Sequence, residues 1–243
     1  MPVERFDENP LIRPEDVSPS HEAFEVVGTF NPAAFEFGGK FGLIVRVAER
    51  PVQTDPATVS VPTFDTEAQP ARLELTHLRR DDPAWDFTDP RIVLYRPEGA
   101  GQHHHLTSLS HLRVAWSEDG RRFRLEDGPA GLWPRNGHER FGIEDPRVTR
   151  IDGRYLITHT AVSESGVCVG LVTTADFRLF AGHGIILPPE NKDACFFPAK
   201  IGGEYVILHR PAGAWCRPGM WIARSSDMVS WGQHEFLAAP RPT

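Results

Sequence analysis

The sequence predicts an all-β protein assembled from repeated units of four short strands. Turn-forming residues recur about every ten residues, and short apolar runs stand between glycines. The apolar period of an amphipathic helix is nearly absent. This combination is typical of a β-sandwich, a β-barrel or a β-propeller, and internal repeats are needed to choose among the three.

Two internal repeats favour the propeller. In the first, a glycine, any residue and an aromatic residue open an apolar strand. The glycines of this repeat are Gly39, Gly153 and Gly203. In the second, a Ser or Thr is followed two positions later by Asp. Its aspartates, Asp119, Asp176 and Asp227, are 57 and 51 residues apart, which is the size of a four-stranded blade. We expect them to be structural, because a carboxylate can bond the backbone N–H groups of a tight turn.

Composition limits the classes of function. The chain has 243 residues, enough for one large β domain, and its net charge of −7 argues against nucleic acid as the main partner. The sequence contains no apolar segment long enough for a membrane span, so we expect no membrane partner. Three cysteines without CxxC spacing are typical of thiols in a reducing compartment. With no leader recognisable after Met1, we expect a cytoplasmic protein.

We expect one domain over residues 1–243, with two parts that differ from the repeats. Residues 1–25 are polar and interrupted by prolines, which predicts an N-terminal arm. Residues 24–47 contain two apolar runs around a Gly-Gly-Lys turn and predict a strand pair. Residues 50–90 show no apolar period and are rich in Pro, Asp and Thr. We interpret them as an insertion in the first unit that forms a protruding hairpin.

Charged residues gather around a proline in the segment Gly142-Ile143-Glu144-Asp145-Pro146-Arg147. Pro146 has no N–H to donate, so the strand that it enters must begin at a rim or a bulge. Two carboxylates held at such a position suit acid–base chemistry on a carbohydrate. The alternative is a plain Asp-Pro turn with a solvated arginine.

The repeats place this segment beside two others. Asn31 and Asp145 each lie eight residues before the glycine of the first repeat. Asp193, preceded by Lys192, lies ten residues before the next such glycine. These positions start the first strand of successive units, and in a propeller that strand lines the central channel. We therefore expect the three positions to converge.

Two other segments favour plain loops. Asp89-Pro90-Arg91 repeats the Asp-Pro-Arg triplet, but no Gly-x-aromatic follows at the same distance, so we expect a turn. His103-His104-His105 would place two imidazoles on one strand face. No cysteine or carboxylate lies at ligand spacing beside them, so we expect a polar loop and no metal site.

The ordered series of motifs resembles glycoside hydrolase family 130, the β-mannoside phosphorylases. The matching segments are residues 9–12, 30–32, 43–46, 110–120, 142–147, 191–198, 209–211 and 221–232. The resemblance implies a five-bladed β-propeller, of which this chain holds about three blades plus the N-terminal arm. Members of the family continue for about two more blades beyond the position of Thr243, so we expect a C-terminally truncated ring. Such a chain should be marginally stable or form a homo-oligomer, and should bind phosphate poorly alone.

The resemblance also implies an activity, the inverting phosphorolysis of β-mannosides to mannose 1-phosphate. Asp145 matches the general acid, which acts through a sugar hydroxyl. Asn31 and Arg46 match residues that hold the mannosyl ring, and Lys192 matches a phosphate-binding position. The further positions implied in substrate binding are Arg147, Asp193, His209 and Arg210. Many family members have Arg-Asn where this chain has Lys192-Asp193, and the added carboxylate would weaken phosphate binding.

The implied substrate is a β-mannooligosaccharide or a mannosyl-glucose, with inorganic phosphate as co-substrate and no cofactor. Phosphate already carries negative charge, so the reaction needs cationic side chains rather than a second carboxylate base. Like charge on Glu144 would keep a proton on Asp145, and Arg147 would act in the opposite direction. Two alternatives stay open: a hydrolase of the same family, which needs a base about 6.5–9.5 Å from the acid, and a propeller fragment that binds sugar or a partner without catalysis.

Overall fold

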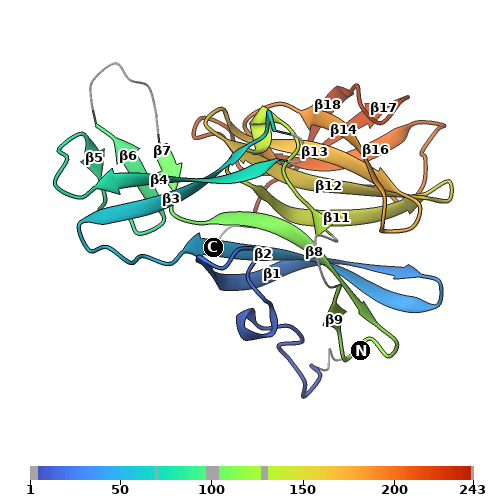
Figure 1. The fold of residues 1–243 in the computed structure, drawn as a ribbon. Helices are drawn as coiled ribbons and strands as arrows, with labels where there is room; N and C mark the ends of the chain where they lie inside the picture. Colours follow the sequence, from blue (N-terminus) through green and yellow to red (C-terminus); the bar gives the residue numbers. More distant parts are fainter. Residues whose placement is uncertain (1–4, 69–70, 97–103, 127–130, 242–243) are drawn as a thin grey trace.

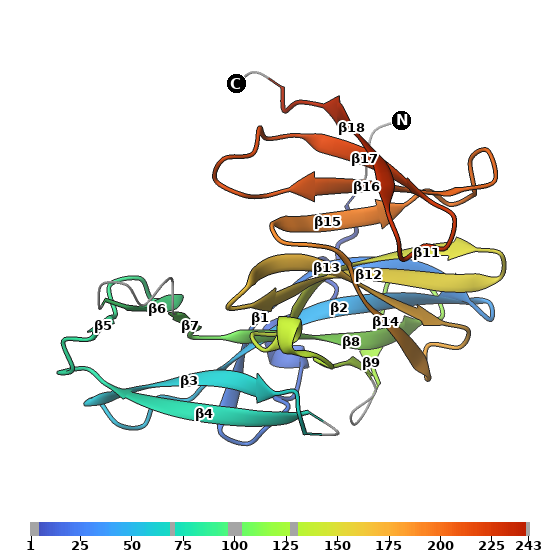
Figure 2. The ribbon, with the colours of Figure 1, turned by 90° about the horizontal axis from the view of Figure 1, so that it is seen from above.

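The protein consists of stacked antiparallel sheets with a smaller protruding part (Figure 1; Figure 2). The computed structural model describes residues 5–68, 71–96, 104–126 and 131–241. Within these residues the secondary structure is strand, apart from two short 3₁₀ turns, η1 (Pro14–Asp16) and η2 (Gly137–Glu139). The all-β prediction is confirmed. No sheet closes on itself in the described ranges.

Three main sheets follow one another along the chain. The first contains β1 (Phe24–Phe37), β2 (Lys40–Pro51), β8 (Leu109–Ser117) and β10 (Gly131–Leu132), with β9 (Arg124–Leu125) also paired to β8. The second contains β11 (Ile143–Ile151), β12 (Arg154–Ser163), β13 (Gly166–Thr174) and β14 (Phe180–Leu187). The third contains β15 (Asn191–Phe196), β16 (Tyr205–Pro211), β17 (Met220–Ser225) and β18 (Gly232–Ala238). In the second and third sheets each strand pairs with the next along the chain, so contacts within them are local.

The insertion lies between β2 and β8 and projects from the first sheet (Figure 1). It contains a hairpin, β3 (Thr58–Asp65) and β4 (Arg72–Arg79), and a small sheet, β5 (Trp85–Asp86), β6 (Ile92–Tyr95) and β7 (His104–Leu106). The small sheet extends past the expected limit at residue 90, and the first main sheet resumes only at Leu109. The insertion has an apolar core of its own, which includes Val61 and Val93 and which explains why these strands hold together away from the main sheets.

The two segments expected to be loops lie in this part of the chain. Asp89 accepts the backbone N–H of Arg91 and pairs with its guanidinium, which lowers the pKa of Asp89 to about 2. This confirms the expected turn. His103 lies outside the described residues, whereas His104 and His105 belong to β7 rather than to a loop. No group of three side chains in the described part could hold a metal ion.

The first repeat corresponds to the hairpin turns that open each main sheet. Gly38 and Gly39 have φ of 59° and 79°, and Asp152 and Gly153 have φ of 50° and 79°. Positive φ at both central residues defines the tight type I′ turn that suits a twisted hairpin. Glycine adopts this conformation without a steric cost. The repeated glycine is therefore a requirement of the turn.

The second repeat corresponds to the turn between the third and fourth strands. Thr174 Oγ1 accepts the backbone N–H groups of Asp176 and Phe177 at 3.2 and 2.9 Å. The Asp176 carboxylate accepts those of Arg178 and Leu179, both at 2.9 Å. Asp119 and Asp227 make the same pair of bonds, which helps to lower the pKa of each to about 2. The structural role expected for these aspartates is confirmed.

Apolar side chains hold the main sheets face to face. Phe35 of the first sheet stacks on Phe177 beside the second, with ring centroids 3.6 Å apart. Between the second and third sheets, Leu156 and Leu171 of the second share one apolar cluster with Phe196 of the third, and Thr149 Oγ1 donates to the carbonyl of Phe196 at 3.2 Å. Each buried aromatic ring stabilises the packing by about 1.5–3 kcal/mol. This stacking places β11 between β1 and β15.

The N-terminal arm covers the outer face of the first sheet. Val17 is buried against Val45 and Val47, so one residue of the arm belongs to the core. The backbone N–H of Ser20 donates to the Glu49 carboxylate at 3.0 Å. No helix in the described part of the chain is long and apolar enough to span a membrane.

We predict that Thr174→Val destabilises the fold by about 1–3 kcal/mol, because the buried N–H of Phe177 and the partly buried N–H of Asp176 lose their acceptor. Valine keeps the shape and the strand preference of threonine, so the change isolates the hydroxyl. Chemical denaturation should show the loss. Thr76→Val on the exposed face of β4 is the matched control and should stay within about 0.5 kcal/mol of the parent. Equal stability of the two variants would contradict this account of the repeat.

Candidate active site

The three positions that the repeats made equivalent lie at equivalent bulges. Strand pairing shifts between Phe30 and Ala33, between Glu144 and Arg147, and between Lys192 and Cys195. The residues that follow the first member of each pair are Asn31, Asp145 and Asp193, with φ of 49°, 48° and 54°. Asn and Asp tolerate this left-handed conformation better than other side chains that carry a Cβ. The bulge therefore explains why only Asn and Asp occur at these positions.

Pro146 occupies the second place of its bulge, and Pro32 does so in the first sheet. A proline is tolerated there because the bulged residue has no ladder N–H to supply. The prediction that Pro146 marks a rim or bulge is confirmed. A strained backbone conformation repeated at three strand starts is typical of functional sites.

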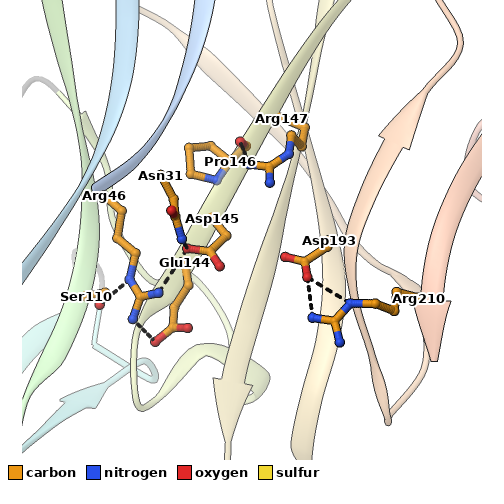
Figure 3. A network of polar contacts seen from close by, with 9 residues as sticks. All are labelled: Asn31, Arg46, Ser110, Glu144, Asp145, Pro146, Arg147, Asp193 and Arg210. Carbon is orange, nitrogen blue, oxygen red and sulfur yellow. Dashed lines mark hydrogen bonds and ion pairs between the residues drawn. The ribbon is translucent and has the colours of Figure 1, made fainter. Parts of the chain in front are cut away.

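The Asp145 carboxylate is held by groups from the first sheet (Figure 3). Asn31 Nδ2 donates to Asp145 Oδ1 at 2.9 Å, and Arg46 Nη1 donates to the same oxygen at 2.9 Å. Arg46 Nη2 donates to Glu144 Oε1 at 2.7 Å. One guanidinium thus bridges two adjacent carboxylates. The structure brings Asn31 and Asp145 together, as the repeats predict, and Lys192 and Asp193 lie close enough for their charges to act on Glu144. Arg46, which the resemblance assigned to the sugar, belongs to the same network.

The Arg46 guanidinium is itself fixed on its other sides. Its Nε donates to Ser110 Oγ at 3.0 Å, and its Cζ lies 4.6 Å from the centre of the Phe30 ring. The Arg46 side chain is only 17% exposed. A planar guanidinium with three directed contacts and a ring beneath it has little freedom to rotate.

The two carboxyl groups differ in proton affinity. Burial raises the pKa of Glu144, although Arg46 opposes this. Burial also disfavours ionisation of Asp145, but the hydrogen bonds from Asn31 and Arg46 outweigh it and hold the pKa of Asp145 below its ordinary value. As the pH falls, Glu144 therefore takes up a proton before Asp145. The sequence suggested a contest between Glu144 and Arg147, whereas Asn31 and Arg46 are the main lowering groups.

The third sheet supplies cationic groups beside this network (Figure 3). Arg210 pairs with Asp193 through two nitrogens, with Nε at 3.1 Å. Lys192 forms no ion pair with any residue that the structure describes, and its charge opposes the rise in the pKa of Glu144. Lys192 is therefore near Glu144 and available to an anion.

Two of the expected residues have other contacts. His209 is 4% exposed, and its ring lies 3.0 Å from the Asn191 amide and 3.2 Å from His234. Burial lowers the pKa of His209 to about 4, so the ring is neutral near pH 7. The Arg147 guanidinium turns back to the carbonyl of Pro146 at 2.9 Å. The assignment of both residues to substrate binding stays a prediction.

Sequence reasoning missed Ser110 and Phe30. Phe30 immediately precedes a predicted position, but nothing in the sequence indicates that its ring lies under Arg46. Ser110 lies beyond the insertion, and no motif relates it to Arg46. The contact of Ser110 with Arg46 depends on the pairing of β2 with β8. This pairing places Arg46 opposite Leu112, two residues along β8 from Ser110.

Enzymes that cleave glycosidic bonds place carboxyl groups beside the scissile bond, and the carboxylates held at the bulges of the second and third sheets suit this class of enzyme. Residues 90–243 match the model of glycosyl hydrolase family 130, described as β-1,4-mannooligosaccharide phosphorylase. The chain belongs to this family.

Characterised relatives point in the same direction. The chain is 46% identical over 243 residues to the β-1,2-mannobiose phosphorylase of Listeria innocua, covering 100% of this chain and 67% of that protein. It is 34% identical over 154 residues to the 1,2-β-oligomannan phosphorylase of a Thermoanaerobacter species, covering 62% of this chain and 50% of that protein. The chain thus spans two thirds of the length of the first relative, and the second match covers half of that relative.

Solved structures show the same fold. The Listeria innocua enzyme in complex with β-1,2-mannobiose matches 98% of this chain and 67% of its own, with a TM-score of 0.88. A family member described among glycoside hydrolases that target β-1,2 mannosidic linkages in Candida mannan matches with a TM-score of 0.61 at 18% identity, which shows the fold alone.

We predict that Asn31→Ala raises the pKa of Asp145, because one hydrogen bond to the ionised form is lost. Carboxyl ¹³C NMR titration of labelled aspartate should show the shift. A lowered pKa stabilises the fold above the ordinary value and loses that effect as the pH falls through the folded value, so the variant should also be less sensitive to acid. Asn136→Ala at η2 is the control. An unchanged Asp145 titration in Asn31→Ala would contradict the geometry.

Proposed function

We propose that this chain carries the catalytic site of an inverting β-mannoside phosphorylase. The observation that supports this most directly is the Asp145 carboxylate, held at a strained bulge between Asn31 and Arg46, with the charge of Lys192 acting on the adjacent Glu144. The names of the relatives supply the substrate class, and β-1,2-mannobiose is the first substrate to test. The products would be mannose and α-mannose 1-phosphate.

In this proposal Asp145 is the general acid. A phosphate oxygen attacks the anomeric carbon from the face opposite the leaving group, and the bond from that carbon to the glycosidic oxygen breaks. The leaving oxygen takes up a proton that originates on Asp145 and passes through a sugar hydroxyl. The pKa of Asp145 is low in the free site, but a bound sugar excludes water and so favours the protonated form.

Lys192 is the proposed phosphate ligand. Phosphate brings its own negative charge, so the site needs a cation rather than a carboxylate base, and no cofactor. Arg210 is largely occupied by Asp193, so of these two cations beside the carboxylates Lys192 is the one that can meet phosphate.

Hydrolysis is the less favoured reaction. An inverting hydrolase needs a second carboxylate about 6.5–9.5 Å from the acid to activate water. Glu144 shares the Arg46 guanidinium with Asp145, and Asp193 is bound to Arg210. Both carboxylates are engaged in ion pairs, so neither is free to take a proton from an attacking water.

We further propose that the three main sheets are blades of a five-bladed propeller. Leu208 and Ile222 pair on the face of the third sheet that points away from the second, and both remain partly exposed. An apolar face of this kind needs a further sheet or a second copy of the chain to cover it.

The three cysteines, Cys168, Cys195 and Cys216, are all free thiols. Free thiols suit a reducing cytoplasm.

The function is tested with β-1,2-mannobiose in the presence and absence of phosphate, and with Asp145→Asn. We expect mannose 1-phosphate only with phosphate. The variant should keep its fold and lose about 10²–10⁴-fold in turnover, because general-acid catalysis is removed. Free mannose without phosphate would support a hydrolase instead. Sugar binding without any product would support a non-catalytic role, and a variant with more than about a tenth of the parent activity would exclude Asp145 as the acid.

We predict that Lys192→Ala raises the KM for phosphate far more than the KM for the sugar. Loss of one charge-assisted contact should cost about 1.5–3 kcal/mol of phosphate binding. Steady-state kinetics with each substrate varied in turn will separate the two constants. Lys200→Ala, which removes a lysine paired to Asp152, is the charge-matched control. Equal increases in both KM values would assign Lys192 to the architecture of the site.

A further inference from the structure

Ser110 contributes to the site in two ways, and the first is through its side chain. It lies on β8 and is 3% exposed. Its hydroxyl oxygen accepts the Nε–H of Arg46 at 3.0 Å. The Nη1 and Nη2 groups are directed to Asp145 and Glu144. The hydroxyl therefore fixes the one guanidinium nitrogen that does not contact a carboxylate, and so sets the rotation of the whole group.

The second contribution comes from the Ser110 backbone. Ser110 forms an isolated parallel bridge with Gly142, the residue that precedes β11. Gly142 has φ of 109°, and a Cβ at this position would collide with the Ser110 backbone. Glycine is thus required for the close approach. The same residue therefore positions both Arg46 and the beginning of the strand that carries Glu144 and Asp145.

We propose that Ser110 is a positioning residue for the general acid, acting through Arg46. This inference rests on the proposed function of Asp145. The hydroxyl holds the guanidinium where Nη1 meets the Asp145 carboxylate. The backbone bridge to Gly142 fixes the beginning of β11, and so the position of that carboxylate relative to Arg46. Ser110 itself touches neither the sugar nor phosphate in this account.

The charged groups around the two carboxylates come from three strands. They are Arg46 on β2, Glu144 and Arg147 on β11, and Lys192 and Asp193 on β15. Among them the Ser110 hydroxyl contacts Arg46, whereas the bridge to Gly142 uses the Ser110 backbone, which a side-chain substitution keeps. Loss of the hydroxyl should therefore weaken one of the groups that keep Asp145 ionised and leave the other charges in place.

The test compares Ser110→Ala with Ser110→Thr, which restores a hydroxyl, and with Ser117→Ala, a control on the same strand. Ser117 is also buried, but its hydroxyl serves the turn at Asp119. We expect turnover of Ser110→Ala to fall about tenfold, as for a misplaced catalytic group. Its KM for phosphate should change by less than about twofold. The alkaline limb of the pH–rate profile should move to higher pH, because a less well held Arg46 lets the pKa of Asp145 rise.

Carboxyl ¹³C NMR of Asp145 makes the inference independent of turnover. If the parent protein shows no phosphorolysis, the proposed function fails. A pKa of Asp145 that is raised in Ser110→Ala but not in Ser117→Ala would still support the positioning role. If the parent is active and Ser110→Ala keeps both its pH profile and its Asp145 titration, the positioning role is overturned. Should Ser110→Ala not fold, Ser110→Cys keeps a side chain with one heavy atom beyond Cβ but a poorer acceptor, and must shift the pKa of Asp145 in the same direction.

Discussion

The site depends on one guanidinium that two adjacent carboxylates share. Glu144 and Asp145 are adjacent, like-charged and partly buried, and the positive charge of Arg46 favours the ionised form of both. Removing one partner of such a buried network typically costs about 3–5 kcal/mol. Because Arg46 belongs to the first sheet and the carboxylates to the second, this network also joins the two sheets. The same interaction thus arranges the candidate site and holds the two sheets together, so a change that loosens one should affect the other.

The three bulges show how one backbone device serves different chemistry. Each turns the side chain of a left-handed Asn or Asp away from the strand ladder. In the first sheet the result is an amide that donates to Asp145. In the second it is the proposed acid, and in the third it is a carboxylate that occupies Arg210. The backbone strain, about 1–3 kcal/mol at each bulge, is sustained because the surrounding sheets are fixed by their own hairpin turns and apolar faces.

Features that recur from one repeat to the next were predictable from the sequence, and those that depend on strand pairing outside the repeat pattern were not. Hairpin glycines, turn aspartates and the grouping of Asn31 with Asp145 follow from spacing, because each is decided within one repeat or by comparing repeats. The role of Ser110 depends on strand pairing across the insertion, which leaves no periodic trace. The sequence does contain an indication that His209 is buried. His209 and His159 each lie six residues after the glycine of the first repeat, and both are buried and hydrogen-bonded in the structure. The extent of the insertion was underestimated because its short strands lack a clear apolar alternation.

The insertion between β2 and β8 has a consequence for the order of folding. The second and third sheets are meanders whose neighbouring strands are joined by short turns, so their contacts close small loops. In the first sheet β8 can pair with β2 only after the whole insertion has been spanned, and closing a longer loop costs more chain entropy. Contacts distant in sequence generally form late. The strand that carries Asp145 should therefore be in place before Ser110 reaches Arg46, and the assembly of the site would be among the last steps by which the chain becomes native.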